Sequence, residues 1–192
     1  MHDGKRGPRL IPGAPLYLGG SAVYIGGEVG SASCEKHILM LDDIYNKRVL
    51  ELAADIPRLG RLAAPDASAR AHSRLCGSTV TIDLCVRDGR VSDFAHDVRA
   101  CALGQASSSL MARGIVGATP EELVELRATM LAMLKAGGPP PQGKWADFAA
   151  LEPVRDFKAR HASTMLTFDA VVDALGQIAA AEGARTPASA TA

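Results

Sequence analysis

Apolar and polar residues alternate between positions 78 and 87, and this period of two predicts a half-buried strand. Its apolar face consists of Val80, Ile82, Leu84 and Val86. The Asp88-Gly89 pair that follows predicts a two-residue hairpin turn, because such turns need positive φ at both central positions. Residues 91–100 then return as a second strand with Phe94, His96 and Val98 on one face. A third, short strand is expected at 70–74.

Elsewhere apolar residues recur every three or four positions, as in amphipathic helices. One such pattern begins at Leu41 and ends at Pro57, and another helix rich in Ala, Gly and Ser is expected from Cys101 to Val116. Residues 119–122 (Thr-Pro-Glu-Glu) predict the capped start of a third helix. Short helical pieces over 145–160 and a last helix with Met165, Phe168, Val172 and Leu175 on one side complete the set. The order predicts an α+β fold, a small three-stranded antiparallel sheet packed against several helices.

The two ends of the chain lack these periods. Residues 1–39 are rich in Gly and Pro, and we predict a disordered extension there, or sequence upstream of a true start at Met40. The spacing of Cys34 and His37 is a weak metal signal that we attribute to chance. A folded domain is expected over 40–180, followed by a disordered tail over 181–192 rich in Ala, Thr and Ser.

Composition narrows the choice of partners and compartment. Lys plus Arg and Asp plus Glu both number 21, so no global charge favours nucleic-acid binding. Four cysteines in 192 residues are too few for a disulfide framework, which favours a reducing, cytoplasmic location. The sequence pattern alone indicates no apolar run long enough to span a membrane, so no membrane partner is expected.

Two cysteines flank the predicted hairpin. Cys101 lies where a strand runs into a helix, and the unpaired N–H groups of a first helical turn favour a thiolate there. Cys76 lies in the loop before the first hairpin strand, and antiparallel pairing should bring the two close together. Cys85 falls on the polar face of its strand and is given no ligand role. His96 is interpreted as a hydrogen-bonded interior residue.

With these cysteines placed, the chain from Met40 to Ile178 resembles the iron–sulfur cluster scaffold family, which includes IscU, SufU and the N-terminal domain of NifU. The first-cysteine loop and the helix after the second cysteine carry most of the resemblance. The matching segments are Leu75-Cys76-Gly77, Cys101-Ala102-Leu103, Ala106-Ser107-Ser108-Ser109, Gly117 to Glu122 and Leu151 to Arg155.

The chain departs from the family pattern at two positions. The family places Asp two residues after its first cysteine, where this chain has Ser78, and its third cysteine aligns with Ser163. His161 lies two positions before Ser163, so the resemblance implies a metal or cluster site of Cys76, Cys101 and His161. A structural zinc site or a [2Fe–2S] cluster takes four ligands, which leaves this set one short. His161 could equally cap its helix or hydrogen-bond a neighbour.

The resemblance implies a scaffold that holds iron, an iron–sulfur cluster or zinc and passes it to acceptor proteins, a binding protein rather than an enzyme. It also implies a cysteine desulfurase as partner and allows a homo-oligomer. One alternative is a sulfurtransferase-like protein in which Cys76 or Cys101 accepts persulfide sulfur. Another is a ligand-depleted relative that acts only as a docking protein.

Overall fold

The structure, a computed structural model, describes residues 16–18, 21–23 and 46–185. The chain divides into two units, Met1–Ile38 and Leu39–Ala192. In the first unit, β1 (Leu16–Leu18) pairs antiparallel with β2 (Ser21–Val23). No strand is predicted there from the apolar pattern, although the intervening Gly19-Gly20 is a common hairpin signal. The rest of the N-terminal expectation, including Cys34 and His37, falls outside the described residues, as do residues 186–192. Residues 181–185, which were expected in the C-terminal tail, are helical.

The second unit contains a three-stranded antiparallel sheet in the order β3-β4-β5, formed by Ala67–His72, Thr79–Arg87 and Arg90–Arg99. Asp88 and Gly89 have φ of 53° and 69°, which confirms the predicted hairpin turn between β4 and β5. The strand predicted at 70–74 is placed too late, since β3 begins at Ala67. Its sequence contains no β-branched residue, so the usual strand signal is missing.

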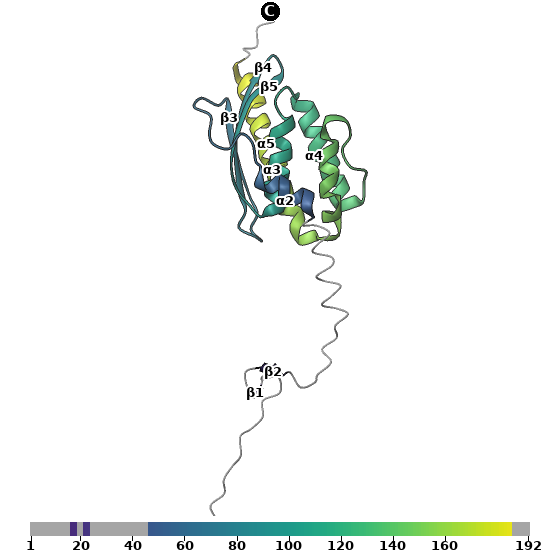
Figure 1. The fold of residues 1–192 in the computed structure, drawn as a ribbon. Coiled ribbons are helices and arrows are strands. Elements are labelled where there is room, and N and C mark those ends of the chain that lie inside the picture. Colours follow the sequence, from purple (N-terminus) through teal and green to yellow (C-terminus); the bar gives the residue numbers. More distant parts are fainter. Residues whose placement is uncertain (1–15, 19–20, 24–45, 186–192) are drawn as a thin grey trace, which may run out of the picture. The chain divides into compact units, whose positions relative to one another are not determined.

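Helices cover one face of this sheet (Figure 1). In chain order they are α2 (Lys47–Ala54), α3 (Ala102–Gly114), α4 (Pro120–Ala136), the 3₁₀ segment η1 (Gly143–Asp156) and α5 (Lys158–Arg185). α3 and α5 contact the strands, and α4 and η1 pack on the outer side of α3 and α5. This arrangement confirms the predicted α+β fold. The described part of the first predicted helix begins at Lys47 and ends three residues before Pro57.

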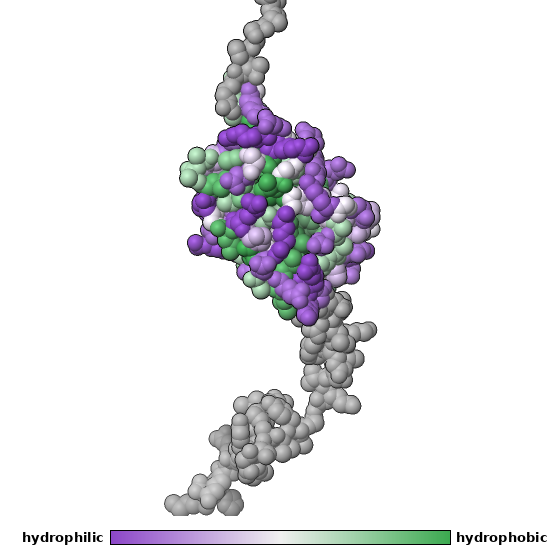
Figure 2. All heavy atoms as spheres, turned by 45° about the horizontal axis from the view of Figure 1, so that its top comes forward, coloured by the Kyte–Doolittle hydropathy of each residue, from purple (hydrophilic) through white to green (hydrophobic). Residues whose placement is uncertain are grey.

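The core lies between the sheet and the helices. The side chains of Val80, Ile82 and Leu84 are fully buried, as their alternation predicts, whereas Val86 is half-buried. Figure 2 shows hydrophilic residues over most of the visible face, with apolar residues in patches between them. Among the exposed apolar side chains, Leu75 is 77% accessible.

α5 is the longest helix of the domain, and it corrects one expectation. Its segment Lys158–Ala184 is long and apolar enough to cross a membrane by length and composition. However, 56% of the apolar window is buried inside the domain, including Met165 and Phe168, which is typical of a core helix. Val171 is buried where Val172, now half-buried, was expected.

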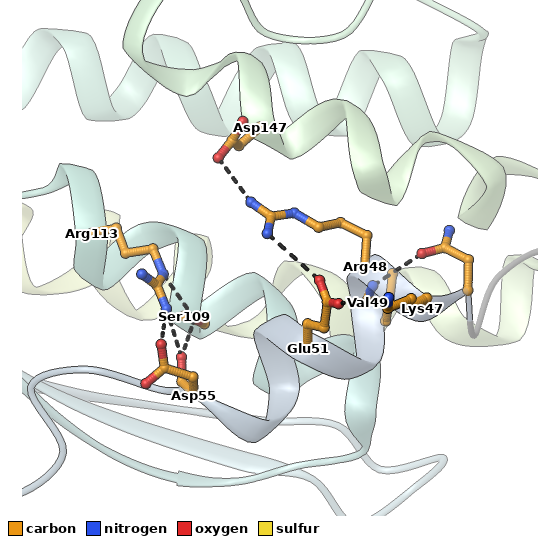
Figure 3. A network of polar contacts seen from close by, with 9 residues as sticks. Lys47, Arg48, Val49, Glu51, Asp55, Ser109, Arg113 and Asp147 are labelled. Atoms are coloured by element: carbon orange, nitrogen blue, oxygen red, sulfur yellow. Dashed lines mark hydrogen bonds and ion pairs between the residues drawn. The ribbon is translucent and has the colours of Figure 1, made fainter.

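Charged side chains of α2 and of the residue after it form ion pairs with η1 and α3 (Figure 3). Arg48 bridges Glu51 of its own helix and Asp147 of η1. Just beyond α2, Asp55 accepts from the guanidinium of Arg113 on α3, with 2.6 Å between Nη2 and Oδ2. These pairs are exposed, so they orient α2 more than they stabilise it.

Asp83 of β4 is fully buried, although the alternating pattern places it on the polar face. Its carboxylate accepts two hydrogen bonds from Arg61 at 2.7 and 2.8 Å, one from the N–H of Leu62 and one from the hydroxyl of Ser68. The hydrogen bond from Arg61 is the main reason that the pKa of Asp83 lies below its ordinary value. The carboxylate thereby holds residues 61–62, which precede β3, against β4.

The outer edge of β5 is occupied by two short backbone segments. The first segment is 58–60: the N–H of His96 donates to the carbonyl of Arg58, and the carbonyl of His96 accepts from the N–H of Gly60. Val91 likewise donates to the carbonyl of Ala118 and accepts from the N–H of Gly117. These four bonds use backbone groups that an edge strand would otherwise present to solvent.

Candidate functional site

Residues 73–78 form the tight loop that joins β3 to β4. The N–H of Ser73 donates to the carbonyl of Ser78, and the N–H of Gly77 donates to the carbonyl of Ser73. Gly77 has φ of 69°, a left-handed conformation that glycine adopts without strain. This folding leaves Cys76 exposed at the end of the sheet.

Cys101 lies at the same end of the sheet. It is the N-cap residue of α3, with the extended angles φ −64° and ψ 167°. Thr79 is paired with His72 on one side and with Arg99 on the other, so the loop before β4 and the residues after β5 are neighbours. The thiol of Cys101 is half-buried, and it leaves the first turn of α3 without a side-chain cap.

A single hydroxyl connects the two cysteines. The Oγ of Ser78 lies 3.0 Å from the Sγ of Cys76, and the backbone N–H of Cys101 donates to the same oxygen at 3.3 Å. Ser78 is only 4% accessible, so this oxygen is held in place between the two loops. The expected proximity of the two cysteine segments is therefore confirmed. Sequence reasoning treated Ser78 as a departure from the family pattern and missed its bridging position.

The electrostatics of the site favour a thiolate on Cys76. Burial by itself would raise the pKa of the thiol, but hydrogen bonds from Ser73 and from the hydroxyl and N–H of Ser78 outweigh it. The positive charge of Arg160 acts in the same direction, and the pKa of Cys76 falls from 9.0 to about 7. From the sequence, thiolate character was expected at Cys101, whereas the structure provides these interactions for Cys76.

The start of α5 packs behind the two cysteine loops. A side chain at Gly104 of α3 would lie 3.1 Å from the carbonyl oxygen of Ser163, so glycine allows the helices to approach closely. Ser107 adds a hydrogen bond to the carbonyl of Thr164 at 2.8 Å. The small residues of α3 therefore serve packing, as predicted. Ser163 is buried, and its hydroxyl donates to the carbonyl of Arg160 within its own helix.

His161 lies in the first turns of α5 and is 8% accessible. Its Nε2 is 3.1 Å from the carbonyl of Val154 and 3.0 Å from that of Arg155, so Nε2 carries a proton that η1 accepts. Across residues 16–18, 21–23 and 46–185, no three His, Cys, Asp or Glu side chains are grouped to hold a metal ion. The described part of the chain therefore does not bring His161 together with Cys76 and Cys101 as a ligand set, and the ligand role of His161 stays a prediction.

Two residues that were set aside from the site lie elsewhere. His96 is fully buried and its Nε2 is 2.9 Å from the carbonyl of Pro57, which confirms the interior reading. Burial lowers the pKa of His96 and keeps the ring neutral at pH 7. The half-buried thiol of Cys85 faces the carbonyl of Ala64 at 3.6 Å.

The fold and site together define a class: a small α+β domain that presents two cysteines from adjacent loops at one end of a three-stranded sheet. Residues 44–164 match the family described as the NifU-like N-terminal domain. The chain belongs to this family, whose curated relatives are iron–sulfur cluster assembly scaffold proteins.

Individual relatives agree with this assignment. The structure superimposes with a TM-score of 0.72 on a nitrogen-fixing NifU-like protein (N-terminal) from Brucella abortus, at 62% identity over 73% of this chain and 98% of that one. The scaffold protein IscU of Thermotoga maritima is 27% identical over 70% of this chain and 94% of its own length. A putative SUF-system scaffold from Fervidobacterium islandicum, 19% identical over 70% of this chain and 98% of that one, shares the fold with a TM-score of 0.65.

Proposed function

We propose that this protein is a scaffold on which an iron–sulfur cluster is assembled on Cys76 and Cys101 and then passed to acceptor proteins. The cluster is the cargo of this process. The observation that carries the proposal is the bridge from Ser78 to both cysteines, which holds two soft ligands at one exposed end of the sheet. A cysteine desulfurase as sulfur source and a cytoplasmic location belong to the same proposal.

The ligand set supports a transient site. Two cysteine ligands come from this chain, and the positive charge of Arg160 offsets part of the negative charge on Cys76. His161 is proposed as third ligand through Nδ1, because Nε2 is engaged with the carbonyls of η1. The remaining positions would be filled by cluster sulfide, water or a second copy of the chain. An incomplete protein shell suits release of the cargo, and the curated relatives, which are iron–sulfur cluster assembly scaffolds, do not support the zinc alternative.

A second candidate, a sulfur acceptor, is favoured by the exposure of Cys76 and its pKa of about 7. A thiol with a pKa near the ambient pH combines a large thiolate fraction with good nucleophilicity. In this reaction the Cys76 thiolate attacks the outer sulfur of a persulfide on the donor. A new S–S bond forms on Cys76, the old one breaks, and the donor cysteine leaves as its thiolate.

Anaerobic reconstitution with ferrous iron and sulfide tests the main proposal. The unmutated protein should develop the visible absorption of an iron–sulfur cluster, which Cys76→Ala or Cys101→Ala should abolish and His161→Ala should weaken. Cys85→Ala is the matched control, since it removes a thiol of the same domain outside the site, and it should leave the absorption unchanged.

Other outcomes separate the alternatives. If no cluster forms but mass spectrometry finds a persulfide on Cys76 after incubation with a desulfurase and cysteine, the sulfur-acceptor function replaces the scaffold. If neither occurs, or if the Cys76 and Cys101 variants behave like the unmutated protein, the docking-protein alternative remains.

A further inference from the structure

A groove of about 670 Å³ runs between α4 and α5, and of its lining residues only His161 enters the cluster proposal above. The groove has an apolar floor of Leu131 and Leu134 from α4 and Met165 from α5. The lining residues of each helix recur every three or four positions, so they form two facing stripes. The stripes extend over residues 127–135 and 158–169, about 12 and 16 Å at 1.5 Å per residue.

The charges along the groove are uneven. At one end, Arg127 of α4 is neutralised by Asp169 of α5, with 2.7 Å between Nε and Oδ1. At the other end lie Lys135, Lys158 and Arg155, of which Arg155 is paired with Glu152. Lys135 and Lys158 are exposed, and neither forms an ion pair with any residue the structure describes. Two uncompensated positive charges therefore stand beside an apolar floor.

We propose that this groove binds an acidic amphipathic helix of a partner protein. An isolated apolar molecule binds best where most of its surface is enclosed. This groove is neither an enclosed cavity nor a flat surface, so it suits an occupant that buries one face and leaves the other in water. A helix two to three turns long fits the stripes, with apolar residues at helical spacing over Leu131 and Met165 and carboxylates beside Lys135 and Lys158.

The position of the groove relates it to the cysteine site. His161 lines the groove, while Arg160, the preceding residue, acts electrostatically on Cys76, and Ser163 contacts α3 one turn from Cys101. A helix in the groove would therefore contact the same turns of α5 that support the two cysteine loops. The interaction is defined without any cluster, so it can be tested on the metal-free protein independently of the proposed function.

The test uses a fluorescein-labelled synthetic helix of about 18 residues, long enough to be partly helical on its own, with a leucine stripe flanked by glutamates. Fluorescence anisotropy should show that the full chain binds this peptide and does not bind a peptide with lysine at every glutamate position. In the double variant Lys135→Glu/Lys158→Glu the dissociation constant should rise about tenfold or more, and added salt should weaken binding to the parent.

Two further variants separate the groove from net charge. Lys47→Glu/Arg70→Glu makes the same change in net charge at exposed positions away from the groove and should bind like the parent. Ala162→Trp narrows the groove from an exposed position without changing charge and should also weaken binding. Circular dichroism checks that every variant is folded.

Several results would overturn the proposal. One is a failure of the unmutated protein to bind the acidic peptide. Another is binding of the peptide by Lys135→Glu/Lys158→Glu and Ala162→Trp that is as strong as binding by the unmutated protein. Equal loss in Lys47→Glu/Arg70→Glu would mean attraction by net charge alone. A dimer of the parent that Lys135→Glu/Lys158→Glu dissociates, without peptide binding, would assign the groove to a second copy of this chain.

Discussion

Asp83 lies on β4 and Cys76 lies in the loop that precedes β4, and the surroundings of these two ionisable groups are opposite. Asp83 is fully buried, and its carboxylate accepts four hydrogen bonds from Arg61, Leu62 and Ser68. Cys76 is exposed on a short loop, and its sulfur has two hydroxyl neighbours, those of Ser73 and Ser78. Interactions lower the pKa of both groups, but only the thiol remains open to an incoming ligand.

The contrast separates a group that holds the fold from a group that is available for chemistry. A buried carboxylate with a complete set of donors stabilises the loop it ties down, and removal leaves those donors unpaired. An exposed thiol with few neighbours contributes little to stability, so it can change its ligands without unfolding the domain. The following changes test this division.

The largest loss of stability is expected for Asp83→Ala. The variant leaves the N–H of Leu62 and the hydroxyl of Ser68 without their acceptor, whereas the half-exposed Arg61 guanidinium can turn to water, and we expect the free energy of unfolding to fall by about 2 kcal/mol at pH 7. Because the folded-state pKa of Asp83 is lowered, its stabilising effect is present above its ordinary pKa and is lost as the pH falls through the folded value. Urea unfolding at pH 7 and at acidic pH measures both effects.

The control for this variant is Asp97→Ala on β5, whose carboxylate is half exposed and lies 3.6 Å from Arg99. That change should alter the free energy of unfolding by less than about 0.5 kcal/mol. Equal stability of Asp83→Ala and the unmutated protein would contradict the structural role of Asp83.

A smaller loss is expected for Gly104→Ala, behind the cysteine loops. Alanine normally stabilises a helix by up to about 1 kcal/mol relative to glycine. Here its Cβ would lie 2.8 Å from the Cβ of Ala100 and 3.1 Å from the carbonyl of Ser163, so we expect a net loss of about 1 kcal/mol or more. Thermal unfolding measures the change, and Gly176→Ala, where a Cβ meets nothing within 4 Å, is the matched control. A stabilised Gly104→Ala would show that α3 and α5 are not in tight contact.

Ser78→Ala should affect reactivity more than stability. In the unmutated protein, alkylation of Cys76 by iodoacetamide should rise with pH through a midpoint near 7, because the thiolate is the reactive form. Loss of the hydroxyl should move this midpoint to higher pH, because one of the hydrogen bonds that lower the pKa of Cys76 against the effect of burial is then missing. Mass spectrometry of the Cys76 peptide follows the reaction, with Ser92→Ala on β5 as a control. An unchanged midpoint would show that the Ser78 hydroxyl does not lower the pKa of Cys76.

No change in stability is expected when the chain begins at Met40. The proposed domain boundary lies before α2, and the N-terminal residues lack the periodic apolar pattern of the domain. The melting temperature of the shortened chain should equal that of the full chain. A decrease of several degrees would mean that part of the N-terminal segment stabilises the domain, which would contradict the proposed boundaries.

The period of two and the Asp88-Gly89 turn predicted β4, β5 and their hairpin, because strand burial is encoded in neighbouring residues. The same pattern misassigned Asp83, since its burial depends on Arg61, which lies 22 residues earlier and reaches it only in the folded sheet. β3 was misplaced because its buried residues are the alanines Ala67 and Ala69, which carry no strand signal. The spacing of residues along a strand predicts which face of the sheet each one occupies. Whether another segment then covers that face, as the segment with Arg61 covers Asp83, depends on the tertiary fold.

The candidate site was predictable to a similar degree. Cys76 and Cys101 could be paired from the hairpin alone, because antiparallel register fixes which ends meet. The contact of Ser78 with both cysteines depends on the left-handed turn at Gly77 and could not be read from spacing. The position of His161 depends on how η1 packs against α5, a contact that no local pattern encodes.

The backbone segments along β5 bear on how copies of this protein could associate. Sheets commonly extend from one molecule to the next when an unpaired strand edge accepts a further strand. A strand added beside β5 would first have to displace the segments at 58–60 and 117–118, with four backbone hydrogen bonds. Continuous sheet growth through this side of the molecule is therefore disfavoured, and a homo-oligomer that involves the β5 side is expected to form through side-chain surfaces.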